Sequence, residues 1–325
     1  GLDVSFFDKL DVTFDWYNRT TTDILVRGTA LPAVLGTTPP TQNSGALRTL
    51  GWDLTTTYRD HLSNGFNFDL RLVLSNYNSE ITKFNGNPNK ILSSLYTGKR
   101  MGEIWGYVTA GTFQTEDQIK KAPSQALLYG GIWYPGDIQY KDLNKDGKIG
   151  PGSNTVSDPG DQKIIGNSTP QLTFGINIDA SWKNFDLNAF FQGVGKRQYW
   201  IGDPGYWGSI LGSNPTPTWY VYNRSWTPDR TGAFFPAYRT QRANVLPQTK
   251  YLINAAYMQL RNITIGYTIP RTIIQDKLHL SQVKIFAAGY DLWKLTKIPN
   301  MFDPQEITDD YPMFKSLAAG IQVQF

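Results

Sequence analysis

The chain has 325 residues, a formal net charge of +4 and no cysteine. The lack of cysteine excludes disulfides, thiol nucleophiles and cysteine-ligated metals, and the small, scattered basic excess argues against a nucleic-acid partner. The sequence also has no run of 18 apolar residues, so we expect no membrane-spanning helix.

Nine segments alternate between apolar and polar residues, which is the pattern of a strand with one apolar face. In chain order they are residues 1–7, 10–16, 46–59, 66–74, 172–182, 185–191, 263–269, 283–293 and 317–325. The last one places Leu317 and Ile321 on one face and ends on Phe325. An amphipathic strand of about ten residues can cross a bilayer in a barrel, or it can complete a soluble β-sandwich. The only helix signal is a capping box at residues 115–118, which predicts a short surface helix.

The connections between these strands alternate in length. Residues 8–9, 60–65, 183–184 and 270–281 form short turns, and residues 24–45, 78–170, 193–255 and 294–313 form long loops. We call the two longest, residues 78–170 and 193–255, the first and second long loops. Outer-membrane barrels place short turns at the periplasmic end and long loops outside the cell, whereas a sandwich has no reason to separate them. An aromatic girdle is expected near the short turns, at Phe7, Phe66, Trp182, Phe185 and Tyr267. We therefore predict an all-β fold: an antiparallel transmembrane β-barrel portion with long extracellular loops.

Nine strands do not close a barrel of this class, because bacterial single-chain barrels have an even number. An open sheet in lipid would expose two unpaired edges, which the bilayer does not tolerate. We therefore expect the remaining strands to come from sequence outside residues 1–325.

Short motifs recur along the whole chain. They are residues 136–149 (GDIQYKDLNKDGKI), 161–167 (DQKIIGN), 170–175 (PQLTFG), 182–187 (WKNFDL) with 192–193, 223–229 (NRSWTPD), 257–270 (YMQLRNITIGYTIP), and 290–297 (YDLWKLTK) with 303–304. Together with the final strand, and in this order, they resemble the SusC/RagA-type TonB-dependent transporters of Bacteroidota. Two departures stand out: Asp291 stands where the family usually has Asn, and residues 151–160 look like an insertion.

The resemblance implies a location in the outer membrane of a Bacteroidota-like Gram-negative cell. It implies that residues 1–325 are the carboxyl-terminal part of a barrel of about 22 strands, with the plug domain and earlier strands absent from this chain. Such transporters import oligosaccharides or peptides under a SusD-like surface lipoprotein. Their energy comes from the TonB–ExbB–ExbD complex, which would act through the missing amino-terminal part.

Three oxygen-bearing residues in the first long loop have the spacing of half a calcium-binding loop. Asp142, Asn144 and Asp146 precede Gly147, as positions one, three and five precede the turn glycine of an EF-hand. Lys148 would contribute its carbonyl, and Asp158 or Asp161 could complete the shell, because Ser153 stands where an EF-hand has glutamate. We expect a structural Ca²⁺ here, against the alternative of an Asx-rich loop that only fixes turns.

Aromatic residues crowd the second long loop. Candidate contacts with substrate or lipoprotein are Trp200, Tyr206, Trp207, Trp219, Tyr220 and Trp226, joined by Trp133 and Tyr134 in the first loop. Three interpretations stay open: stacking on sugar rings, anchoring the lipoprotein, and packing of loop on loop.

The sequence offers no catalytic constellation, so we predict no enzymatic activity. His61 and His279 lie near predicted short turns without motif context, and no nucleophile elbow, zinc motif or phosphate loop is present. The rival prediction from another class is a secreted, calcium-stabilised carbohydrate-binding β protein.

Overall fold

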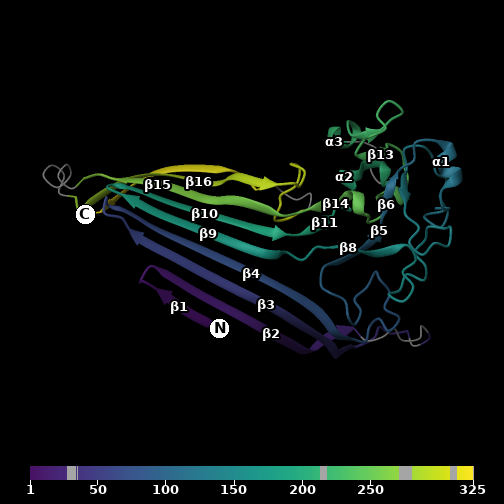
Figure 1. The fold of residues 1–325 in the computed structure, drawn as a ribbon, viewed down its shortest axis with the longest axis horizontal. Helices are drawn as coiled ribbons and strands as arrows, with labels where there is room; N and C mark the ends of the chain where they lie inside the picture. The colour runs from purple at the N-terminus through teal and green to yellow at the C-terminus, as the bar shows by residue number, and fades with distance from the viewer. Residues whose placement is uncertain (28–33, 35, 213–217, 271–279, 308–312, 325) are drawn as a thin grey trace.

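The computed structural model describes residues 1–27, 34, 36–212, 218–270, 280–307 and 313–324. Its main feature is a nine-stranded antiparallel sheet in the order β1-β2-β3-β4-β9-β10-β15-β16-β17 (Figure 1). The strands are β1 (Leu2–Phe6), β2 (Leu10–Arg27), β3 (Thr41–His61), β4 (Phe66–Phe84), β9 (Gln171–Trp182), β10 (Phe185–Lys196), β15 (Tyr257–Thr268), β16 (Gln282–Thr296) and β17 (Ser316–Gln324). All nine predicted strands are confirmed. Phe325, His279 and most of the turn at 270–281 lie outside the described residues.

Five strands extend well beyond their predicted ends, toward the long loops: β10 continues to Lys196, β15 begins at Tyr257, and three more do the same. β2 continues to Arg27, β3 begins at Thr41, and β4 continues to Phe84. In the extensions of β2 and β4 polar side chains occupy both faces, and Ser79 in the β4 extension pairs with Thr49 of β3 through a hydroxyl–hydroxyl hydrogen bond of 2.8 Å. Main-chain ladder bonds do not require an apolar face, so alternation of apolar residues marked only part of each strand.

One face of the sheet is apolar across its width. A row followed through the strand register contains Leu70, Ile178, Ala189, Ile263, Gly289 and Leu317. Large apolar side chains on this face are exposed, including Ile265 (52%) and Ile321 (67%). The opposite face is polar, with Asp69 opposite Asp179. Apolar residues outside and polar residues inside form the wall of a membrane barrel.

The loops between β4 and β9 and between β10 and β15 fold together at one end of the sheet (Figure 1). Between β4 and β9 lie β5 (Glu103–Tyr107), β6 (Thr109–Thr112), α1 (Glu116–Lys121), β7 (Ile138–Tyr140) and β8 (Gln162–Asn167). Between β10 and β15 lie β11 (Gln198–Trp200), α2 (Pro204–Trp207), η2 (Gly208–Ile210), α3 (Trp219–Tyr222), β12 (Ser225–Trp226), β13 (Phe235–Ala237), η3 (Arg242–Val245), η4 (Thr249–Tyr251) and β14 (Leu252–Asn254). None of the helices in the described part of the chain is both long and apolar enough to span a membrane.

The predicted surface helix is confirmed as α1. The side chain of Thr115 accepts a hydrogen bond from the Gln118 amide at 3.3 Å, as an N-cap should. The reciprocal bond differs from a standard capping box, because Gln118 Oε1 accepts from the amide of Gln114 at 2.7 Å. The Gln118 side chain thus bonds the amide of Gln114, one residue before the N-cap, and not the amide of Thr115 that a capping box uses.

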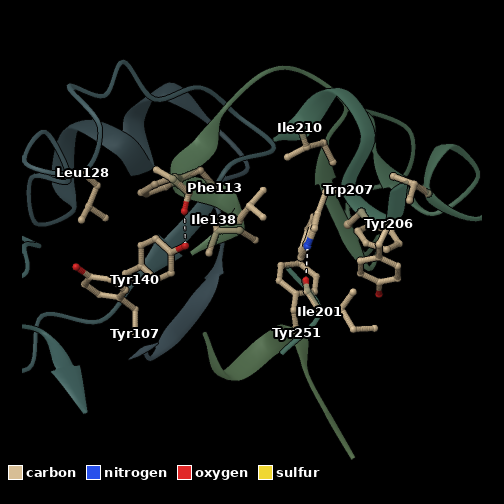
Figure 2. Close-up of a cluster of buried hydrophobic side chains, with 14 of the residues drawn as sticks. Tyr107, Phe113, Leu128, Ile138, Tyr140, Ile201, Tyr206, Trp207, Ile210 and Tyr251 are labelled. Carbon is tan, nitrogen blue, oxygen red and sulfur yellow. Dashed lines mark hydrogen bonds between the residues drawn. The ribbon is translucent and has the colours of Figure 1, made fainter. Parts of the chain in front are cut away.

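The main hydrophobic core lies in the loops and not in the sheet. Its buried members come from residues 107–149, 201–255 and 298–307. Figure 2 shows Tyr107 and Tyr140 of the first loop on one side and Trp207 and Tyr251 of the second loop on the other. We call the described parts of residues 85–170, 197–256 and 297–307 the loop domain.

Candidate functional site

Three of the predicted aromatic contacts are buried in the loop-domain core. Asp203 caps α2 by accepting from the Tyr206 amide at 3.1 Å, which sets Tyr206 and Trp207 into the core. The Trp207 indole is fully buried and donates to the Ile201 carbonyl at 2.6 Å (Figure 2). Trp133 is buried as well. These side chains have no free surface for a ligand, so for them the expected substrate or lipoprotein contact is replaced by loop-on-loop packing.

Other predicted aromatics are half-buried against this core. Trp200 stacks on Trp207 with ring centroids 5.7 Å apart. Tyr220 lies beneath the guanidinium of Arg224, 4.1 Å from its ring centroid. The Trp226 indole donates to Gln114 Oε1 at 3.0 Å, which ties the second loop to the first. Their polar and ring partners lie within the loop domain.

Trp219 and Tyr134 are the predicted aromatics that remain exposed. Trp219 on α3 is 77% exposed and meets Tyr222 edge to face at 6.1 Å. Tyr134 is also exposed, with the guanidinium of Arg239 4.5 Å from its ring centroid. Trp and Tyr are the residue types enriched among the anchors of protein–protein interfaces.

A buried polar centre joins the two loops. The Asp137 carboxylate is fully buried, accepts from Asn244 Nδ2 at 2.9 Å and from the Tyr134 amide at 2.9 Å, and forms an ion pair with Arg239. Burial raises the pKa of Asp137 above its ordinary value, against the opposing effect of these donors. Sequence reasoning did not single out this residue, although it lies in the motif at 136–149.

Tyr140 extends this polar centre. Its hydroxyl donates to the Ala243 carbonyl at 2.5 Å and accepts from Gln248 Nε2 at 3.0 Å. The amide of Tyr140 donates to Gln125 Oε1 at 2.6 Å. Burial raises the pKa of Tyr140 well above the ordinary tyrosine value, so the phenol keeps its proton and remains a donor. These contacts fix the loop domain as one packed unit.

The predicted calcium loop adopts a tight series of Asx turns. Asp142 Oδ1 and Oδ2 accept from the amides of Lys145 (2.6 Å) and Gly147 (2.9 Å). Asp146 Oδ1 accepts from the Lys148 amide at 2.8 Å, and Asp146 Oδ2 accepts from Asn144 Nδ2 at 3.0 Å. Gly147 has φ of 80°, the left-handed conformation that glycine adopts without strain. The structure therefore brings Asp142, Asn144 and Asp146 together.

The two further predicted ligands have separate roles. Asp161 is buried and accepts from the amides of Leu143 (2.7 Å) and Gly150 (2.8 Å), so it closes the base of the loop. Asp158 accepts from the Ser153 amide (2.8 Å) and Oγ (2.6 Å) in the next turn. Among the described residues, no three His, Cys, Asp or Glu side chains gather in metal-binding geometry.

Asp142, Asn144 and Asp146 nevertheless fit a hard cation. A carboxylate has about four lone-pair sites, and the observed amide contacts occupy only some of them. We propose that these three residues, with the Lys148 carbonyl, hold a structural Ca²⁺.

Asp291, the departure from the family pattern, lies at a bulge in β16. Its φ is 52°, a conformation that asparagine and aspartate tolerate better than most residues. Asp291 Oδ1 accepts from Arg261 Nη1 at 2.8 Å and from Gln259 Nε2 at 3.0 Å. Aspartate thus satisfies the backbone geometry expected for Asn and adds an ion pair.

The chain matches no family model, but it has curated relatives. TonB-dependent receptor P3 of Formosa agariphila is 27% identical over 320 residues, covering 94% of this chain and 30% of the receptor. Receptor P26 of the same organism is 24% identical over 311 residues, covering 90% and 29%. The chain thus spans about a third of the length of these relatives.

Solved structures agree with this relationship. The RagAB peptide importer in its "open-open" state matches with a TM-score of 0.72 at 21% identity, covering 98% of this chain and 33% of the other. The "closed-closed" state gives 0.68 at 20% identity, with 98% and 34% covered. These likenesses establish the fold of the sheet and its loops. The chain is thus similar over most of its length to TonB-dependent receptors, as its SusC/RagA-type motifs indicate, and it shares the fold of the corresponding third of an outer-membrane β-barrel transporter.

Proposed function

We propose that this chain forms the carboxyl-terminal wall and surface loops of an importer for oligosaccharides or peptides. In this proposal TonB supplies the energy and a SusD-like lipoprotein covers the outer mouth. The plug domain and the other strands belong to sequence outside residues 1–325. The chain itself binds and guides ligand and catalyses no reaction.

The observation that carries this proposal is the match of nearly the whole chain, wall and loops together, to RagAB importers. The two faces of the sheet support it, since one is apolar and exposed and the other is polar. The secreted carbohydrate-binding alternative has no comparable support. It would require the native protein to be recovered in aqueous buffer without detergent.

Trp219 and Tyr222 offer a surface for the lipoprotein. They lie together on α3 and are 77% and 53% exposed, although the rest of the aromatic cluster is packed. Exposed aromatic pairs of this kind dominate interface energetics. We assign the lipoprotein contact to this pair.

Transport is tested in a cell that expresses the whole transporter. Deletion of the transporter and deletion of TonB are each expected to abolish uptake of the same oligosaccharide or peptide. Uptake that survives the loss of TonB contradicts the proposal.

The partner is tested by quantifying the SusD-like lipoprotein that copurifies with the whole transporter. The double variant Trp219→Ala, Tyr222→Ala should lose at least about tenfold of it. Tyr129→Ala removes another exposed aromatic of the loop domain and should lose none. Equal recovery from all three proteins would remove α3 from the interface.

A further inference from the structure

We propose that a polar pocket at the junction of sheet and loop domain binds the acidic group of a sugar, so that the transporter favours acidic oligosaccharides. This inference rests on the import function proposed above and names its substrate class. The pocket has a volume of about 470 Å³, within the range of about 300–1,000 Å³ for small-molecule sites. Its polar side chains come from β4, β8, β9, β10, β11 and adjoining segments, and include Asn78, Arg100, Asn167, Gln171, Lys196 and Gln198.

Two cations in this pocket lack a counter-charge. Arg100 and Lys196 form no ion pair with any described residue, and both side chains are exposed. By contrast, Arg48 in β3 forms an ion pair with Glu80 at 3.3 Å. An unpaired guanidinium and an ammonium in one pocket favour an anionic ligand.

The carboxylate that lines the pocket is already engaged. Glu103 Oε1 accepts from the Trp105 indole at 3.0 Å and from the Tyr96 hydroxyl. Glu103 Oε2 accepts from the main-chain amide of Arg100 at 3.3 Å. Its hydrogen bonds fix it to the wall of the pocket, and the two cations leave the lining with a net positive charge.

The amides of the pocket present mainly donors. Gln198 Oε1 accepts from the Asn167 amide at 3.1 Å, which leaves the Gln198 amino group free to donate. A Cβ at Gly166 would lie 2.8 Å from that same Oε1, so glycine keeps the space that Gln198 occupies. Gln171 Nε2 donates to Asn78 Oδ1 at 2.7 Å, which leaves the Asn78 amino group unused. A surface rich in donors is complementary to carboxylate or sulfate oxygens and hydroxyl lone pairs.

Asn167 makes the wall of this pocket rigid. Its Nδ2 donates to the Met101 carbonyl at 3.0 Å, and its Oδ1 accepts from the Thr169 amide at 2.8 Å. Both ends of the Asn167 side chain are thereby fixed. Because the main-chain amide of Asn167 also holds Gln198, the amino group of Gln198 is positioned before a ligand arrives. Such preorganisation reduces the ordering cost of binding.

The composition of the lining favours a sugar over a peptide. Ile164 is the one large apolar side chain among the lining residues, and the others are amides, charged groups, a hydroxyl and glycines. Sugar hydroxyls both donate and accept, which suits amide groups, whereas a peptide would bring apolar side chains without a matching surface. An acidic oligosaccharide supplies both the anion and the hydroxyls.

The test is calorimetric titration of the purified whole transporter with three probes: trigalacturonate, neutral galactotriose and triglutamate. Trigalacturonate should bind at least about tenfold more tightly than the other two, and more weakly at high salt. Arg100→Gln with Lys196→Gln should lose at least about tenfold of this affinity. The matched control, Lys120→Gln with Lys163→Gln, removes two exposed charges of the same domain outside the pocket and should bind like the wild type.

Each other outcome overturns the inference. These are no binding of trigalacturonate, equal binding by the pocket variant with an unchanged melting temperature, or equal binding of triglutamate, which would make the pocket a peptide site. TonB-dependent uptake of other ligands in that case would leave the import function standing. Conversely, if trigalacturonate binds through the pocket but no uptake depends on TonB, the proposed import function is wrong and the binding site remains supported.

Discussion

Arg239 in the second long loop forms an ion pair with Asp137 in the first, across a sequence separation of 102 residues. Asp137 is fully buried and the Arg239 side chain is 30% exposed, so the carboxylate depends on this cation and on Asn244 for compensation. The pair therefore connects the halves of the loop domain in a way that no local motif provides.

Removing the cation should destabilise the loop domain. Arg239→Met leaves a buried charge without a partner, a change that typically costs about 3–5 kcal/mol. Burial already raises the pKa of Asp137 in the folded chain, so the folded chain binds this proton more tightly than the unfolded chain does. Protonation of Asp137 therefore favours folding fully below the ordinary value of 3.8, and this contribution is lost as the pH rises through the folded pKa. Loss of Arg239 raises that pKa further, so tryptophan-monitored melting should show a larger deficit at pH 8 than at pH 5. The double variant Asp137→Asn, Arg239→Met should remove this pH dependence. A pH-independent deficit in Arg239→Met would show that the carboxylate is not responsible.

Lys250 gives a second pH dependence, of opposite sign. Its ammonium donates to Thr112 Oγ1 at 3.2 Å and to the Ala233 carbonyl at 3.5 Å, and burial lowers its pKa from 10.5 to about 8. Between these values the unfolded chain binds the proton and the folded chain does not, so this residue makes folding more favourable as the pH rises.

Lys250→Met should therefore raise the melting temperature at pH 7.5 and gain less at pH 10. The exposed Lys141→Met serves as the control for loss of one charge. A gain in melting temperature that is the same at both pH values would contradict the role of this titration.

The sheet could be predicted from sequence because each strand, taken alone, alternates between a lipid-facing and a water-facing side. A strand between lipid and an aqueous interior must alternate, so Ile263 and Thr264 reveal their faces without knowledge of the neighbours. The loop domain offers no such period. Trp207 and Trp219 lie in one aromatic-rich stretch, yet the first is fully buried and the second is 77% exposed. That difference depends on packing partners brought from distant loops.

The acidic loop falls between these cases. Its contacts join residues two to five positions apart, so the spacing of Asp142, Asn144 and Asp146 predicted their convergence. Asp161 closes the same loop from 18 positions away, and its partner, the Leu143 amide, could not be read from spacing.

Calcium content tests whether this loop holds metal. The double variant Asp142→Asn, Asp146→Asn removes two carboxylates but keeps the turn-forming oxygens, because asparagine also accepts the amide hydrogen bonds. We expect the whole transporter to lose its bound calcium, measured by elemental analysis after dialysis. Asp158→Asn, in the neighbouring turn, should retain it. Calcium that stays bound to the double variant would exclude these residues as ligands.

The lipid face is tested by two adjacent substitutions in the middle of β15. Ile263 lies opposite Ala189 and Gly289 on the apolar face, and Thr264 lies opposite Asn188 and Ala288 on the other. Ile176 and Ile321 share the predicted lipid-facing role of Ile263.

Ile263→Arg should cost about 2–4 kcal/mol of folding free energy near the middle of the bilayer, measured by urea titration of the complete barrel in vesicles. Thr264→Arg adds the same group to the water-facing side and should cost much less. Arginine is the sharpest probe because its guanidinium cannot shed its proton to escape the hydrocarbon. Equal costs at the two positions would mean that the sheet does not separate lipid from water.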